Sequence, residues 1–175
     1  MSSTDRVLVL GGIRSGKSRL AETLLGDLSG DLRYVATGAP ADRDPEWAAR
    51  VDAHRGRRGE RWQTVESADV AGVLSGADPV PTLVDDVGGW LTAAYDGRGW
   101  AGDVSPDIES LVAAVDRYPA PLVLVSPEVG LTLVPATASG RLFADALGTA
   151  NQRLAAVCER VLLVVAGVPV RIKGA

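Results

Sequence analysis

Residues 11–18 read Gly11-Gly12-Ile13-Arg14-Ser15-Gly16-Lys17-Ser18, and this octapeptide sets the expectation for the whole chain. It matches the pattern G-x-x-x-x-G-K-[ST] of phosphate-binding loops at every fixed position. An apolar run at 7–10 precedes it and a stretch with helical spacing at 18–25 follows, which is the context that the pattern requires. Glycines let the loop point backbone N–H groups at phosphate oxygens, and the helix N-terminus adds a favourable dipole. We therefore predict that this loop binds nucleotide phosphates.

Two residues of the loop have individual roles. Lys17 is expected to reach the β and γ phosphates, and the Ser18 hydroxyl is expected to ligate Mg²⁺. Such a loop works with a carboxylate at the end of a neighbouring strand, which holds Mg²⁺ directly or through water. The run at 82–86 ends in Asp85 and Asp86, and these residues by themselves leave open which carboxylate has that role.

The rest of the chain alternates short β-branched runs with stretches of helical spacing. Buried strands are expected at 7–10, 33–37, 82–86, 122–126 and 161–166. Helices are expected at 17–25, 45–55, 68–74, 108–117 and 138–159. Within them Leu142, Leu147, Leu154 and Val157 are expected in the core, and residues 95–105 are expected to form a mobile surface loop. The alternation predicts an α/β protein with a P-loop nucleotide-binding fold, in which helices flank a mostly parallel central sheet.

Length and composition limit the remaining possibilities. A chain of 175 residues suits one domain spanning 1–175. The 46% hydrophobic and 23% charged residues exclude a disordered chain and a fibrous repeat. One cysteine, Cys158, and one histidine cannot complete a structural zinc site. The run before the loop is too short for a signal peptide, and no apolar stretch reaches the roughly 18 residues of a membrane span. We expect a soluble cytoplasmic protein.

The charges are distributed unevenly. A net charge of −4 argues against nucleic acid as the main partner, because that binding needs a basic surface. Between 50 and 61, however, five arginines accompany only two acids and surround the only histidine, His54. Neighbouring cations favour a neutral imidazole that can act as a nucleophile, and guanidinium groups can hold a triphosphate. These residues suggest a nucleotidyl-transfer site, with a solvated helix face and an incidental histidine as the alternative.

Four stretches together resemble a known enzyme family. They are residues 11–18, the tetrapeptide Tyr34-Val35-Ala36-Thr37, the run at 48–66 with Arg50, His54, Arg58 and Glu66, and a C-terminal half with Glu128-Val129-Gly130, 134–135, 151–155 and 164–174. In this order they resemble the bifunctional adenosylcobinamide kinase and adenosylcobinamide-phosphate guanylyltransferase of cobalamin biosynthesis. The resemblance covers nearly the whole chain and is far more specific than the phosphate loop alone.

The resemblance implies two reactions in one nucleotide site. Enzymes of this family phosphorylate the aminopropanol hydroxyl of adenosylcobinamide with ATP or GTP, and then transfer GMP from GTP to the new phosphate through a GMP-histidine intermediate. His54 matches that histidine. The other residues matched to nucleotide contacts are Gly11, Gly12, Ile13, Arg14, Ser15, Gly16, Lys17, Ser18, Thr37, Gly38, Ala39, Arg55, Gly56, Arg57, Arg58, Glu66 and Asp85, with Ser18 and Asp85 toward Mg²⁺. The family also suggests a homotrimer.

Two places depart from the family pattern. Pro127 stands where the family usually has an asparagine, and proline has neither a side-chain amide nor a backbone N–H. The family's Cys-Leu-Thr-Leu-Trp-Leu-type run is here Asp86-Val87-Gly88-Gly89-Trp90-Leu91. Both departures flank strand ends, where ligands bind in open α/β sheets. They favour one other reading, a GTP-binding module that has lost one or both activities. A third reading is a P-loop kinase of another small alcohol, which would need the phosphate loop and Asp85 but not His54.

Overall fold

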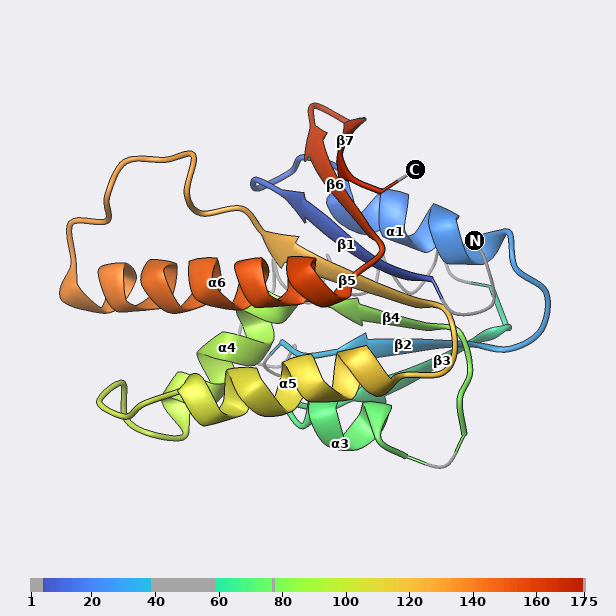
Figure 1. Cartoon of the computed structure of the whole chain (residues 1–175), viewed down its shortest axis with the longest axis horizontal. Helices are drawn as coiled ribbons and strands as arrows, with labels where there is room; N and C mark the ends of the chain where they lie inside the picture. The colour runs from blue at the N-terminus through green and yellow to red at the C-terminus, as the bar shows by residue number, and fades with distance from the viewer. Residues whose placement is uncertain (1–4, 39–58, 77, 175) are drawn as a thin grey trace.

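The computed structural model describes residues 5–38, 59–76 and 78–174, whose elements form a layered α/β arrangement (Figure 1). The strands are β1 (Arg6–Gly11), β2 (Leu32–Ala36), β3 (Trp62–Glu66), β4 (Thr82–Asp85), β5 (Leu122–Pro127), β6 (Arg160–Val165) and β7 (Val168–Lys173). The helices are α1 (Lys17–Gly26), α3 (Val70–Leu74), α4 (Val87–Asp96), α5 (Ser105–Arg117) and α6 (Ala138–Val157). Across the sheet the strands lie in the order β3-β2-β4-β5-β1-β6-β7. Neighbouring strands are parallel except β7, which pairs antiparallel with β6.

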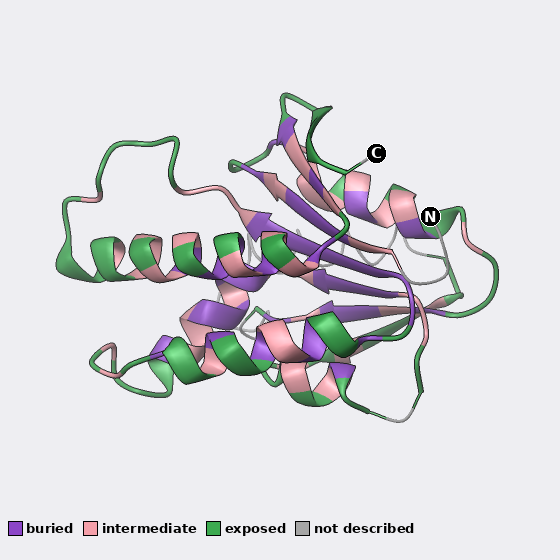
Figure 2. Ribbon diagram, in the orientation of Figure 1, coloured by how far each residue is buried: buried purple, intermediate pink, exposed green. Residues whose placement is uncertain are grey.

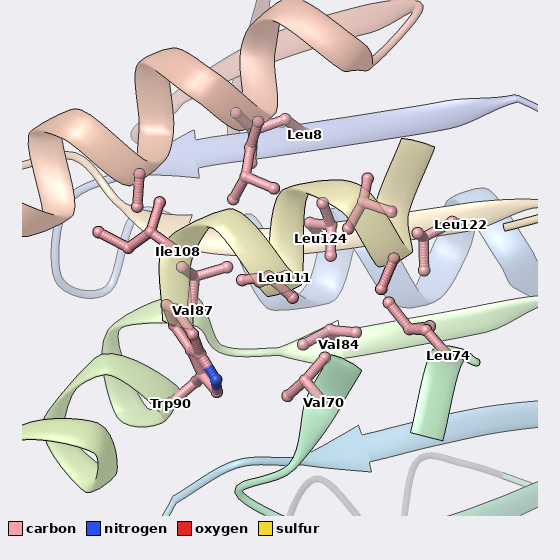
Figure 3. Close-up of a cluster of buried hydrophobic side chains, with 14 of the residues drawn as sticks. Leu8, Val70, Leu74, Val84, Val87, Trp90, Ile108, Leu111, Leu122 and Leu124 are labelled. Carbon is pink, nitrogen blue, oxygen red and sulfur yellow. The ribbon is translucent and has the colours of Figure 1, made fainter. Parts of the chain in front are cut away.

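Helices cover both faces of this sheet. Helices α3, α4, α5 and α6 lie on one face, and α1 lies on the other (Figure 1). Leu8 of β1 packs into the cluster on the four-helix face together with Val84 and Leu124 (Figure 3), whereas its neighbours Val7 and Val9 pack toward α1. Successive residues of a strand point to opposite faces, so a strand covered on both sides must be apolar throughout. Figure 2 shows this as buried strands in the middle of the sheet.

The topology brings several chain segments together at the carboxyl edge of the sheet. The loop after β1, the segment after β2, the first turn of α4 after β4, and the end of β5 all lie at this edge. Because β5 lies between β1 and β4, the end of β5 lies between the strand that leads into the phosphate loop and the strand that leads into α4. This edge is where open α/β sheets bind ligands.

The predicted class and the mostly parallel central sheet are confirmed. All five predicted strands form within one residue of their expected bounds. Among the helices, the predictions at 17–25, 68–74, 108–117 and 138–159 correspond to α1, α3, α5 and α6, and the prediction at 45–55 falls outside the described residues. Leu147 and Leu154 are fully buried as expected.

Three elements had no counterpart in the sequence prediction. β3 and β7 are edge strands, and β7 is exposed along its whole length. Because an edge strand need not be buried on both faces, neither has the continuous apolar run that marks a buried strand. Helix α4 begins with Val87, Gly88 and Gly89, and glycine is a poor helix former. Its buried residues Trp90, Leu91 and Tyr95 hold it against the core, so tertiary packing overrides local propensity.

Two expectations about burial were wrong. Leu142 is 40% exposed and belongs to the N-terminal part of α6, whose first turns extend past the strands of the sheet (Figure 1). Tyr95, expected at the start of a mobile surface loop, is buried at the end of α4 and stacks on Trp100 with 5.1 Å between ring centroids. Within the described ranges, no helix is both long enough and apolar enough to cross a bilayer.

Candidate active site

The phosphate loop of residues 11–18 joins β1 to α1 in a turn with left-handed backbone angles at two positions. Gly16 has φ +95° and Arg14 has φ +56°, so the loop passes twice through the left-handed region. Gly16 is also the residue that precedes α1, and no side chain caps the helix there. The N-cap residue therefore does not occupy the first N–H groups of α1, and a helix N-terminus without a capping side chain suits an anion.

The loop is hydrogen-bonded to the turn between β6 and β7. The Gly167 N–H donates a hydrogen bond to the Ser15 carbonyl at 2.8 Å, and the Ser15 N–H donates to the Gly12 carbonyl at 3.2 Å. A Cβ on Gly11 would lie 2.5 Å from Ser15 Oγ and 2.9 Å from the Val164 carbonyl oxygen. Gly11 is therefore required by close packing, and sequence reasoning did not identify the contribution of Gly167.

Lys17 and Ser18 occupy the first turn of α1. The Lys17 Nζ donates a hydrogen bond to the Gly12 carbonyl at 3.3 Å, so the ammonium group folds back over the loop. The Ser18 Oγ donates to Asp85 Oδ1 at 3.3 Å, which brings a hydroxyl and a carboxylate oxygen together at the end of β4. These are hard oxygen donors of the kind Mg²⁺ prefers.

Asp85 is fixed from the opposite side by a residue that sequence reasoning did not assign to the site. The Tyr34 hydroxyl, from the buried strand β2, donates a hydrogen bond to Asp85 Oδ2 at 2.9 Å. Tyr34 lies within one of the stretches that carry the family resemblance, but a tyrosine inside a strand gives no local sign of its partner. The contact depends on β2 and β4 being neighbours in the sheet.

Asp86 has a different role from Asp85, because β4 ends at Asp85 and Asp86 is the N-cap of α4. Its Oδ1 accepts a hydrogen bond from the Gly89 N–H at 2.7 Å. Burial raises the pKa of the Asp86 carboxyl above its ordinary value, while the hydrogen bond from Gly89 and the positive charge of Lys17 act in the opposite direction. Asp86 therefore caps a helix beside the phosphate loop, and Asp85 is the carboxylate that contacts Ser18.

Thr37 connects the end of β2 to this cap. Its Oγ1 donates to the Asp86 carbonyl at 2.6 Å and accepts from the Asp86 N–H at 3.0 Å. Thr37 is almost completely buried, and Gly38 follows it at the same edge. Glu66 ends β3 opposite Ala36 of β2 and is exposed.

The remaining site predictions lie outside the described residues. They are Ala39, His54, Arg55, Gly56, Arg57 and Arg58. The structure thus brings together the phosphate loop, Thr37, Gly38 and Asp85 at one edge. In the described part of the chain, no three His, Cys, Asp or Glu residues form a metal-binding group.

Comparison with known proteins identifies the family. Residues 7–172 match the family described as cobinamide kinase / cobinamide phosphate guanyltransferase. The chain belongs to this family. The match includes every site residue discussed above, from the phosphate loop to Asp85, and position 54 also lies within its bounds.

Curated relatives agree over their full length. The chain is 41% identical to the bifunctional adenosylcobalamin biosynthesis protein CobU of Escherichia coli (strain K12), covering 95% of this chain and 99% of the relative. It is 38% identical to the protein named CobP of Pseudomonas aeruginosa, covering 97% of this chain and 98% of the relative.

Solved structures show the fold at much lower identity. An ATPase from the type III secretion system of pathogenic bacteria aligns with a TM-score of 0.59 and 14% identity, over 97% of this chain and 57% of that chain. A Pyrococcus horikoshii OT3 protein, titled a structural study of Project ID PH0250, aligns with a TM-score of 0.54 and 11% identity, over 99% of this chain and 88% of that chain. These likenesses support the P-loop fold alone.

Proposed function

We propose that this chain phosphorylates adenosylcobinamide with ATP or GTP and then transfers GMP from GTP to adenosylcobinamide phosphate, giving adenosylcobinamide-GDP and pyrophosphate. The observation that carries the proposal is the family match over 7–172, which contains an intact phosphate loop whose Ser18 contacts Asp85. The names of the relatives place them in adenosylcobalamin biosynthesis, and the same role is proposed here.

In the kinase step the substrate hydroxyl oxygen attacks the γ-phosphorus and releases its proton to water, the bond to the β–γ bridging oxygen breaks, and the nucleoside diphosphate leaves. The N–H groups of the loop and the Lys17 ammonium hold the triphosphate and stabilise charge on its oxygens. Ser18 and Asp85 would hold Mg²⁺, and their oxygens lie 3.3 Å apart, which fits two adjacent ligands. When bound, the ion would neutralise part of the phosphate charge. The Tyr34 hydroxyl keeps Asp85 turned toward Ser18.

In the transfer step the His54 imidazole attacks the α-phosphorus of GTP and pyrophosphate leaves. The new P–N bond is then broken by an oxygen of the substrate phosphate, which takes the GMP group and frees the histidine. Arg55, Arg57 and Arg58 would hold the triphosphate, since guanidinium groups bind phosphate oxygens in pairs. The remaining proposed nucleotide contacts are Thr37, Gly38, Ala39, Gly56 and Glu66.

Incubation with α-labelled GTP and Mg²⁺ tests this proposal against its two alternatives. We expect covalent label that is acid-labile and alkali-stable, as a phosphoramidate is, and a labelled peptide containing His54. The His54→Asn variant should lose the label and keep most of its kinase turnover on cobinamide, because the hydroxyl attacks the γ-phosphorus directly. Turnover without label would instead support a kinase of another alcohol. Binding without turnover would support a GTP-binding module, which the departures at Pro127 and Gly88-Gly89 favour.

Two further parts of the proposal concern the state of the protein in the cell. We propose a homotrimer with a cytoplasmic location. Exposed aliphatic side chains on the terminal hairpin, including Val168, Val170 and Ile172, support self-association, because they are apolar and uncovered in the single chain. Light scattering coupled to size exclusion would give a mass three times that of the chain, and a monomer mass would contradict this part.

A further inference from the structure

The two departures from the family pattern, which lie 39 positions apart in sequence (127 minus 88), touch each other in the structure. A Cβ built on Gly88 would lie 2.9 Å from Cγ and 3.1 Å from Cδ of Pro127. Both are atoms of a closed ring that cannot rotate away as the end of a flexible side chain can. Gly88 thus has no side chain at the place that the proline ring occupies.

The neighbouring Gly89 makes an equally close approach on the other flank of α4. A Cβ there would lie 3.0 Å from Thr37 Oγ1 and 3.4 Å from the Gly38 backbone nitrogen. The first turn of α4 therefore fits between the end of β5 and the segment after β2, with one glycine against each. Two consecutive glycines disfavour a helix. The close packing on both sides of this turn explains why glycines stand there.

Pro127 is itself held firmly against the phosphate loop. It lies opposite Gly11 in the pairing of β1 with β5, and the next residue, Glu128, donates its N–H to the Gly11 carbonyl at 3.1 Å. The Pro127 carbonyl accepts a hydrogen bond from Asn151 Nδ2 at 3.0 Å, and Asn151 Oδ1 accepts from the buried Ser126 hydroxyl at 2.6 Å. The ring cannot shift to admit a side chain at position 88 without disturbing the first residue of the loop.

We propose that Gly88 and Pro127 form a matched pair that positions the first turn of α4 against the phosphate loop. Through that turn the pair sets the place of the Asp86 cap and of Thr37, which is hydrogen-bonded to Asp86 on both its N–H and its carbonyl. In this proposal Gly88 and Pro127 are positioning residues, which act through Asp86 and Thr37. The two departures are then one compensated change, and the proposal deepens the proposed function, on which its kinetic test rests.

A double-mutant cycle tests the pairing, using the residues that the family usually has at these positions. The variants are Gly88→Thr, Pro127→Asn and the double variant. Gly148→Ala serves as the control, because Gly148 lies within α6 and its Cβ would meet nothing within 4 Å among the described residues. For each we would measure the Kd of a fluorescent GTP analogue, the thermal midpoint, and kcat and KM for phosphorylation of cobinamide.

We expect Gly88→Thr to weaken nucleotide binding by roughly tenfold, and Pro127→Asn in the same chain to recover most of that loss, as residues in contact do. Gly148→Ala should match the unaltered protein in Kd, kcat and KM, with a somewhat higher thermal midpoint, because alanine is a better helix former than glycine. Loss and recovery of Kd and KM in variants whose thermal midpoints all stay well above the assay temperature would separate positioning of the site from a general effect on folding. If Gly88→Thr does not fold, Gly88→Ala with and without Pro127→Ala provides the same cycle with smaller changes.

Additive effects of the two substitutions would overturn the proposal, as would a Gly88→Thr variant that binds nucleotide like the Gly148→Ala control. The nucleotide titration needs no cobinamide, so it separates this inference from the proposed function. Coupled Kd values without any cobinamide phosphorylation would support the pair and contradict the function. Phosphorylation with additive Kd values would do the reverse.

Discussion

Replacement of Lys17 with alanine removes the charge that the proposed mechanism uses most directly, at little cost to the fold. Lys17 Nζ makes one long hydrogen bond, 3.3 Å to the Gly12 carbonyl, and forms no ion pair among the described residues. Losing that bond from an exposed loop should lower the free energy of unfolding by about 0.5 kcal/mol or less. Alanine is also a better helix former than lysine, which offsets part of the loss in α1.

The effect on nucleotide binding should be much larger. A hydrogen bond from a charged group to a phosphate contributes about 1.5–3 kcal/mol, so Kd for GTP should rise between roughly 10-fold and 150-fold. The loss in kcat/KM should exceed the loss in binding, because charge on the γ-phosphate oxygens is redistributed in the transition state. Titration with a fluorescent GTP analogue and a coupled assay of cobinamide phosphorylation measure the two effects separately.

Arg19→Ala is the matched control, since it removes a positive charge from the exposed face of the same helix two residues away. That variant should bind GTP as the unaltered protein does. Near-normal Kd and turnover in Lys17→Ala would refute the assignment of the phosphate loop. If the thermal midpoint of Lys17→Ala fell so far that the variant unfolded, Lys17 would contribute more to stability than its one hydrogen bond to Gly12 accounts for.

Four more predictions concern the site and the core. Asp85→Asn should reduce kinase activity far more than Asp86→Asn, because only Asp85 contacts Ser18 while asparagine can still cap α4; equal losses in kcat would contradict the separate roles. Because the Asp86 pKa is raised in the folded state, the protonated form of this carboxyl favours folding. That contribution is fully present below the unfolded pKa and is lost as pH rises through the folded pKa. Urea unfolding at pH 7 should therefore show Asp86→Asn at least as stable as the unaltered protein. Gly16→Ala should cost roughly 1–2 kcal/mol of stability, measured by the same unfolding, since φ at Gly16 is +95°; an unchanged midpoint would contradict that geometry. Burial raises the pKa of the Cys158 thiol to about 12, so a disulfide reagent at pH 8 should leave it unmodified until urea unfolds the chain, and rapid reaction of the native protein would be the contrary result.

The phosphate loop could be predicted from sequence because its chemistry is local. A strand, two glycines at fixed spacing, a lysine and a hydroxyl residue follow one another along the chain, and their positions relative to phosphate depend on backbone angles of the same eight residues. The buried strands were predictable for a similar reason, since a strand covered on both faces must be apolar at every position. The edge strands β3 and β7 lack that requirement and were not predicted.

The sequence alone therefore determined the α/β class, the phosphate loop and, through the ordered motifs, the family. Only the tertiary structure decided which carboxylate faces Ser18, since Asp85 and Asp86 are adjacent in sequence and differ only in that one ends β4 and the other caps α4. It also decided that Tyr34 holds Asp85 and that Gly88 fits Pro127. Each of these contacts joins residues that are distant along the chain, and the order of strands in the sheet, which no local pattern encodes, brings them together.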